Sequence, residues 1–275
     1  MRTPTRYKKI PILLSLALIS AGALGVVTPI SSAATTISLG SSGSYGVLAG
    51  AGLSNSGATT IIGDQGSSPS ATYSGFNKVT VTGETHLGDA TAATAQVDAK
   101  SSYKNLVLQS STQLIVGDLG GQILAPGVYT TSASIGITGN LTLDAKGDPN
   151  AVFIFRAGST LTTSSSSSVS MTNGGSQCNV YWLVGSSATL GANSTFLGTV
   201  LASSNITAGT GATIFGRLLA LKGTTVLDNN LITVSTCSQT PGVAPTSPAG
   251  SHSLAQVPIW PKGAVNTGDG SLGKI

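Results

Sequence analysis

Threonine recurs at one fixed place in a repeated segment that lies between Cys178 and Cys237. In each repeat a threonine follows a short apolar run, and in two repeats a glycine stands two residues later. A threonine offers a hydroxyl and a methyl group without a charge. A column of outward-facing threonines would therefore form a flat surface able to hydrogen-bond a regular partner. The residues predicted to make this surface are Thr160, Thr162, Thr189, Gly191, Thr207, Gly209 and Thr225.

This prediction requires Leu190, Ile206 and Val226 to point inward. A slip of one residue in any strand would reverse every side chain of that strand. A threonine ladder could also do no more than support the sheet by cross-strand packing. That alternative stays open at the level of the sequence.

A neighbouring surface offers a second set of threonines. Thr195 and Thr213 lie on the strand that closes each repeat, but Leu197 and Phe215 follow two residues later and would interrupt a flat polar plane there. The second strand of each repeat is therefore the preferred face.

Catalytic chemistry finds little support in the sequence. Ser is abundant, yet no Gly-x-Ser-x-Gly elbow precedes a helix, and His86 stands alone in a loop. Two thiols without a nearby His make a poor metal site. We predict no catalytic residue, no metal and no cofactor. Acids are scattered and not clustered, among them Asp64, Asp118, Asp144, Asp148 and Asp228.

The repeat itself predicts the fold class. Each unit of roughly 18–20 residues holds three short strands, which is typical of one coil of a triangular β-solenoid. Each unit opens with an apolar run, at Val180–Val184, Thr199–Ala202 and Arg217–Leu221, and residues 151–172 read as a further coil. The protein is therefore expected to be mainly β, with a three-faced solenoid.

One stretch breaks the pattern. Residues Asp89 to Gln109 contain no Gly or Pro, are rich in Ala, and begin with an Asp that can cap a first turn. The residues expected along the apolar stripe of one long amphipathic helix are Ala93, Val97, Ala99, Tyr103, Leu106 and Val107. Packing this helix along the first strands of the coils would bury both surfaces.

The chain begins with a pattern typical of a secretory signal peptide. Arg2, Arg6, Lys8 and Lys9 precede an apolar run, and small residues follow, so we expect residues 1–34 to be removed after Ala33 or Ala34. An uncleaved membrane anchor is the alternative. Without this segment, nine basic residues balance nine acidic ones. A neutral chain gives no reason to expect nucleic acid or a membrane surface as a partner.

The remaining chain divides into two parts. Residues 35–237 are expected to form the solenoid domain. Residues 238–275 are Pro-, Ser- and Gly-rich and read as a linker and a disordered tail. A docking segment, or an association of the tail with the cell wall, is the alternative. An exported chain can form a disulfide between Cys178 and Cys237, although the coils between them would force the segment after Ser235 to run back along the stack.

Several long motifs, in order, resemble a known family. They are SYGVLAGAGLSNSG, IIGDQGSSPS, LAPGVYT, AVFIFRAGSTL, CNVYWLVGSSATLGANSTFLGTVLA, GRLLAL and VLDNN, and they cover roughly Ile37 to Cys237. The chain resembles the secreted microbial ice-binding (antifreeze) proteins. That resemblance implies a discontinuous solenoid, in which the N-terminal segment forms a coil at one end, and a long helix packed beside it.

The same resemblance implies ice as the partner. Thr207-Ala208-Gly209-Thr210 is similar to a T-A/G-x-T/N pattern found on the ice-binding face of some members. We expect a secreted monomer that adsorbs to ice and inhibits its growth and recrystallisation. The alternative is a cell-surface adhesion or carbohydrate-binding module that uses the solenoid as a stalk, for which exposed aromatic rings would be the sign.

Overall fold

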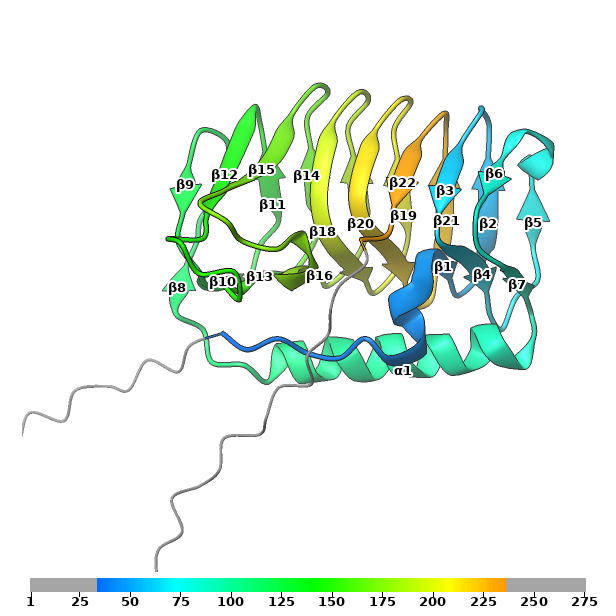
Figure 1. Ribbon diagram of the computed structural model, residues 1–275, viewed down its shortest axis with the longest axis horizontal. Coiled ribbons are helices and arrows are strands. Elements are labelled where there is room, and N and C mark those ends of the chain that lie inside the picture. The colour runs from blue at the N-terminus through cyan, green and yellow to red at the C-terminus, as the bar shows by residue number, and fades with distance from the viewer. Residues whose placement is uncertain (1–33, 236–275) are drawn as a thin grey trace, which may run out of the picture. The chain divides into compact units, whose positions relative to one another are not determined.

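The computed structural model describes residues 34–235. The predicted signal peptide up to Ala33, Cys237 and the predicted tail lie outside the described residues. The described chain winds into stacked three-strand coils, with a long α-helix running beside the stack (Figure 1). The predicted fold class, a three-faced β-solenoid with one helix along an apolar face, is confirmed.

Every strand pairing given for the stack is parallel, and the strands form three faces. The first face contains, in order, β8 (Gln113–Leu114), β10 (Gly127–Thr131), β13 (Phe153–Ala157), β16 (Val180–Val184), the second halves of β18 (Thr195–Ala202) and β20 (Thr213–Ala220), β1 (Tyr45–Ala49), β4 (Asp64–Ser67) and β7 (Thr85–Leu87). The second face contains β11 (Ile135–Ile137), β14 (Leu161–Thr163), β17 (Ala188–Leu190), β19 (Ile206–Ala208), β21 (Thr224–Leu227), β2 (Gly52–Asn55) and β5 (Tyr73–Ser74). The third face contains β9 (Ile123–Leu124), β12 (Asn140–Asp144), β15 (Ser168–Thr172), the first halves of β18 and β20, β22 (Leu231–Thr233), β3 (Thr60–Ile62) and β6 (Thr80–Val81).

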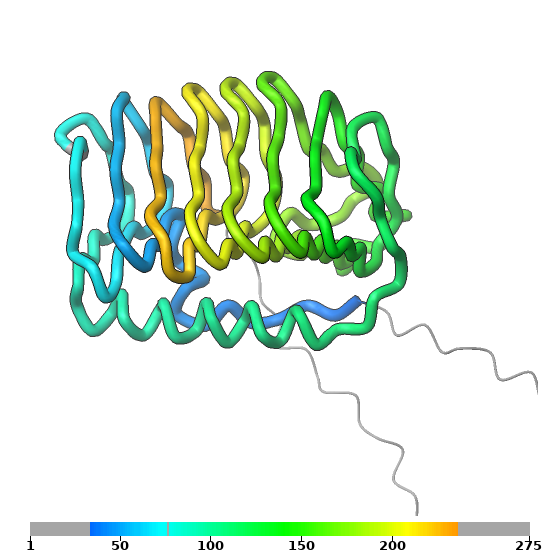
Figure 2. The backbone as a smooth tube through the Cα atoms, turned by 180° about the vertical axis from the view of Figure 1, so that it is seen from behind, coloured from blue at the N-terminus to red at the C-terminus, as the bar shows by residue number. Residues whose placement is uncertain are grey.

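The coils are not stacked in chain order. Strand β1 pairs with β20 in the register Val47↔Leu218, β2 pairs with β21, and β3 pairs with β22. The N-terminal coil therefore lies on the last coil of the C-terminal run, as Figure 2 shows for the blue coil next to the orange one. This is the discontinuous order that the family resemblance implies.

The centre of the stack is filled by one apolar cluster drawn from all three faces. Aromatic rings from successive coils stack along it. The Tyr129 and Phe155 ring centroids are 5.2 Å apart, and those of Phe155 and Trp182 are 4.0 Å apart at an interplanar angle of 12°. Because alternate residues of a strand point to opposite faces, the residues between them form a second apolar surface outside the stack.

Helix α1 (Ala90–Val107) covers that second surface. The Asp89 side chain caps it by accepting a hydrogen bond from the Ala92 amide at 2.8 Å. Its buried side is lined by small residues, which let the helix lie close to the leucines of the first face. Within the described part of the chain, no helix is long and apolar enough to cross a membrane.

The helix face predicted from the sequence is partly wrong. Val97 is 61% exposed and Ala93 also faces solvent. Ala99 and Leu106 pack as predicted. Toward the start of the helix the buried side is offset by one residue, about a quarter of a turn, so that Ala92 and Gln96 pack instead of Ala93 and Val97. The buried residues, mostly small ones that fit close against the sheet, are Ala92, Ala95, Gln96, Ala99, Ser102 and Leu106.

Residues 34–44, which end in the 3₁₀ helix η1 (Gly40–Ser44), lie beside the helix on the first face. The Gln109 side chain exchanges two hydrogen bonds with the backbone of Thr35, and the Asp98 carboxylate accepts from the Ser41 amide at 2.7 Å. Buried Arg217 donates from Nε to the Gly43 carbonyl at 2.7 Å. The helix and residues 34–44 together cover the apolar surface of the first face.

Candidate functional site

The second face carries one row of outward residues in strict register. Thr162 pairs with Thr189, and Thr189 pairs with Thr207. The residues on either side of them in each strand are buried, so the row points away from the core. The full row, which we call the central column, is Gly136, Thr162, Thr189, Thr207, Val226, Ser54 and Ser74.

The prediction for Thr225 is wrong. Its side chain is fully buried, and Thr207 pairs with Val226 instead. The reason is the preceding turn. Three residues separate Ala202 from Ile206 in one coil, whereas four separate Ala220 from Thr225 in the next. The additional residue reverses the direction of every side chain in β21.

Thr160 faces outward but lies outside the central column, two residues before Thr162. It belongs to a flanking row, in which its Oγ1 donates to Ser134 Oγ at 2.8 Å. Farther along this row, Asn205 Oδ1 accepts from the Thr224 amide at 2.9 Å. These bonds join neighbouring coils, so the hydroxyl and amide groups at this edge are held in place.

Gly191 and Gly209 lie at the opposite edge of the face, where neighbouring coils approach each other closely. A Cβ at Gly191 would come within 2.4 Å of the Ser164 carbonyl group, and one at Gly209 within 2.8 Å of the Ala192 nitrogen. Neither backbone could move without disturbing the stack. Glycine at both positions keeps this edge level, as the sequence predicts.

The site is electrically neutral at its centre, and the carboxylates near it are occupied. At one end, Asp118 accepts from the Thr138 and Gly120 amides at 2.9 and 2.6 Å. Hydrogen bonding from Thr138 lowers the pKa of Asp118. At the far edge, Asp228 accepts from the Thr210 hydroxyl. Both acids therefore serve as turn caps.

His86 lies between Asp89 and Glu84, with Nδ1 2.8 Å from Asp89 Oδ2 and Nε2 3.2 Å from Glu84 Oε2, at the start of α1. Among the described residues, no group of three or more His, Cys, Asp or Glu side chains is arranged to hold a metal ion.

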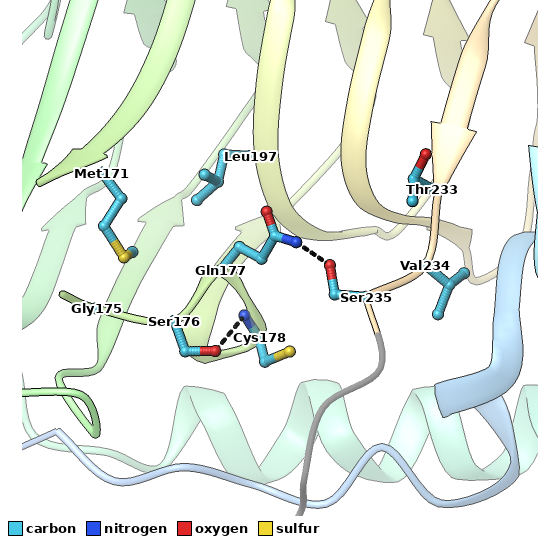
Figure 3. Close-up of a pocket in the computed structure, with 9 residues that line it drawn as sticks. All are labelled: Met171, Gly175, Ser176, Gln177, Cys178, Leu197, Thr233, Val234 and Ser235. Carbon is cyan, nitrogen blue, oxygen red and sulfur yellow. Dashed lines mark hydrogen bonds between the residues drawn. The ribbon is translucent and has the colours of Figure 1, made fainter.

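An open hollow of about 530 Å³ lies on the third face (Figure 3). Met171, Leu197 and Val234 line it, and at its side the Gln177 amide, on the 3₁₀ helix η3 (Gln177–Asn179), donates to the Ser235 hydroxyl. That contact shows the chain after β22 running back to an earlier coil.

Cys178 also borders the hollow and is disulfide-bonded. The sequence holds one other cysteine, Cys237, outside the described residues. The pairing of these two cysteines stays a prediction.

Comparison with known proteins identifies the fold and its relatives. A family model described as ice-binding-like matches residues 47–233. The chain belongs to this ice-binding-like family. An ice-binding protein from Nostoc sp. (strain HG1) is 42% identical over 225 residues, which cover 81% of this chain and 83% of that protein. The resemblance seen in the sequence motifs is thereby confirmed.

Solved structures of the family share the architecture. The ice-binding protein of Antarctomyces psychrotrophicus superposes with a TM-score of 0.71 at 40% identity, covering 74% of this chain and all of that one. An ice-binding protein from an Antarctic biological consortium gives a TM-score of 0.72 at 37% identity, covering 76% of this chain and 95% of that one.

Some residues of the central column were not predicted from the sequence. Ser54 and Ser74 belong to N-terminal coils, and no repeat pattern indicates that these coils extend the same face. The motif GLSN shows no alternation of apolar and polar residues, because the polar Asn55 follows Ser54. The missing information is the stacking order, which local sequence does not contain.

Proposed function

We propose that this protein adsorbs to ice through its second face and thereby inhibits ice growth and recrystallisation. The observation that carries the proposal is the central column, whose small uncharged side chains follow one another in register across seven paired strands. Its relatives are named as ice-binding proteins.

The chemistry of the face suits a crystalline water partner. Coils repeat every ~4.8 Å and alternate residues of a strand every ~6.6 Å, so hydroxyl and methyl groups stand on a fixed lattice. Threonine hydroxyls can join an ordered water layer while their methyl groups exclude disordered water. Each contact is weak, and affinity comes from many contacts made at once by groups that lose little freedom on binding.

Rigidity is what this fold contributes. The face is backed by a buried apolar core, and its edges are tied from coil to coil by the Thr160–Ser134 and Thr224–Asn205 hydrogen bonds. No catalytic step and no cofactor are part of the proposal. It includes export of the chain and action as a monomer, with any association of the tail with a cell wall secondary to ice binding.

A carbohydrate-binding role has weaker support. Sugar sites commonly stack on exposed aromatic rings. In the described part of the chain, the largest aromatic side chains are in the core, including Trp182, Tyr129, Phe155 and Phe196. The central column contains none.

The test is a bulky substitution at the centre of the face. Thr207→Tyr should leave the fold intact, because the residue is half-exposed, and should reduce ice recrystallisation inhibition at least about tenfold through steric mismatch. Thr142→Tyr, at an outward position of β12 on the third face, is the matched control and should retain activity. Full activity of Thr207→Tyr, or no activity of the wild type at micromolar concentration, would overturn the proposal.

A further inference from the structure

A second row of outward polar residues runs along the third face, next to its corner with the second face. It occupies the first outward position of each third-face strand. Thr195 pairs with Thr213 and with Ser168, so three neighbouring coils present hydroxyl groups in register. The full row, which we call the edge column, is Asn140, Ser168, Thr195, Thr213, Leu231, Thr60 and Thr80.

The apolar residues expected to interrupt the polar surface of the third face lie outside this row. Leu197 and Phe215 stand two residues farther along β18 and β20, in register with each other and with Thr233. They form a separate stripe. Leu197 is only 9% exposed, so it hardly rises from the surface. The edge column is therefore uninterrupted at Ser168, Thr195 and Thr213.

The corner between the two columns has the same hydrogen bonds in three successive coils. In each, the last outward residue of the second face accepts a turn hydrogen bond from a buried residue, Ser164 from Ser167 at 3.2 Å and Gly191 from Ser194 at 3.2 Å. Gly209 accepts from Ala212 at 3.1 Å in the third. A turn repeated in this way sets one fixed separation between the two columns.

Bonds between coils lock the corner further. The Ser166 amide donates to the Ala192 carbonyl at 2.8 Å, and the Asn193 amide donates to the Thr210 carbonyl at 2.9 Å. Thr213, the first residue beyond the corner, donates to the Ser194 carbonyl at 2.8 Å. The edge column is thus held as firmly as the central column.

The surface across this corner is small and largely uncharged. Ser166 and Asn193 take up left-handed backbone conformations, with φ of 57° and 54°, and both are exposed. Serine, asparagine, threonine, alanine and glycine fill the turn in these coils, and the acid Asp228 accepts a hydrogen bond from the Thr210 hydroxyl. No bulky side chain separates the two columns there.

We propose that the edge column is a second ice-binding surface, inclined to the second face, so that one molecule recognises two different ice planes. This rests on the proposed function, because it assumes that a register-aligned row of small polar groups binds ice. The two faces meet at a corner and cannot lie against one flat crystal surface. Each column therefore requires its own plane.

The experiment separates the columns by substitution. Fluorescently labelled protein is adsorbed to a single-crystal ice hemisphere, and the illuminated planes are mapped for wild type, Thr207→Tyr, Thr213→Tyr and Thr195→Tyr. Ser170→Tyr, exposed on the third face but outside the edge column, is the control. Circular dichroism and thermal unfolding establish that each variant is folded, and Thr195→Tyr serves if Thr213→Tyr is not.

The expected result is a pattern of two plane families for wild type and for Ser170→Tyr. Thr207→Tyr should keep one family and the edge-column variants the other, each with at least a tenfold loss of signal on the affected planes. A wild-type pattern from both edge-column variants overturns this inference and leaves the proposed function standing. Absence of wild-type adsorption to any plane overturns both.

Discussion

Thr207 of β19 lies opposite Val226 of β21, and the side chain of Thr225, the residue before Val226, is buried in the core. A single residue added to the turn before β21 causes this exchange. The outward row therefore continues through a valine, which offers two methyl groups and no hydroxyl. The second face is therefore partly apolar at β21, where Val226 points outward and the neighbouring Thr225 is buried.

Replacing Thr225 by Val should stabilise the protein. The Thr225 hydroxyl is buried and has no hydrogen-bond partner within the described residues, and such a group costs about 1–3 kcal/mol. Val has nearly the same shape, so the free energy of unfolding should rise by about 1 kcal/mol and the melting temperature by about 2–4 °C. Thermal unfolding measures this, with the half-exposed Thr207→Val as a control that should change little. A lower melting temperature for Thr225→Val would show that the hydroxyl has a partner.

Val226→Tyr should impair ice activity while Thr142→Tyr does not. Val226 occupies the central column between Thr207 and Ser54. A tyrosine ring at this position would hold the second face away from the ice surface. We therefore expect a loss of recrystallisation inhibition of about tenfold or more. Full activity would mean that the effective face ends at Thr207.

The sequence predicts most of the architecture because that information is local. Alternation of apolar and small residues marks the strands, and Asp89 marks the start of the helix. The direction of Thr225 was not predictable in the same way, since it depends on a turn that is one residue longer than its neighbours. The buried side of α1 was predicted only in part. Ala99 and Leu106 pack there as expected, but the apolar Val97 faces solvent and the small Ser102 is buried against the sheet.

Enlarging the buried side of the helix should destabilise the fold. Ala99 is fully buried against the first face, and Ala99→Leu should cost about 1–3 kcal/mol by overpacking. Val97→Leu on the exposed side of the same helix should stay within about 0.5 kcal/mol of wild type. Denaturant unfolding compares the two. Equal effects would mean that the helix lies against the sheet loosely.

His86 should make the stability depend on pH. The hydrogen bond with Asp89, aided by the charges of Glu84 and Asp64, raises the pKa of His86. Because the folded state favours the protonated ring, this stabilisation is complete below the unfolded pKa of about 6.5 and is lost as pH rises through the folded value. The melting temperature should therefore fall as the pH rises above about 6.5.

The variant His86→Gln supplies the comparison for that prediction. Its melting temperature should show a weaker dependence over the same range, because the glutamine amide does not titrate. Since Asp89 also caps α1, the helix signal in circular dichroism should follow the same trend. An unchanged pH dependence in His86→Gln would assign the effect to another group.

Reduction of the disulfide should destabilise the protein but leave the second face and its ice activity intact. Cys178 is disulfide-bonded, and loss of a disulfide typically costs about 2–4 kcal/mol. Thiol titration under denaturing conditions should find no free thiol before reduction and two after it. The double variant Cys178→Ser, Cys237→Ser should melt as the reduced wild type does, while its recrystallisation inhibition below the melting temperature stays near that of the wild type.

The position of the site shows the same division between local and distant information. Thr189 and Thr207 could be aligned because consecutive coils share one repeat, but the sequence favoured Thr160 over Thr162 as the neighbour of Thr189. Ser54 and Ser74 could not be aligned, because their coils join the face from the other end of the chain. The sequence suggested that Leu197 and Phe215 would interrupt the polar surface around Thr195 and Thr213. Only the strand register shows that these apolar residues lie in a separate row.

The stacking of β1 on β20 also determines when the protein can fold. Arg217 reaches Gly43 across 174 residues of chain, and Val47 finds its partner Leu218 at nearly the same distance. A polypeptide made from its N-terminus presents the first coils long before their neighbour exists. Such distant pairings make folding slow, and they leave the early strands exposed until the last coil arrives. For the export in an extended state that we propose, such a delay would be an advantage, because the N-terminal coil could close onto the stack only after β20 had crossed the membrane.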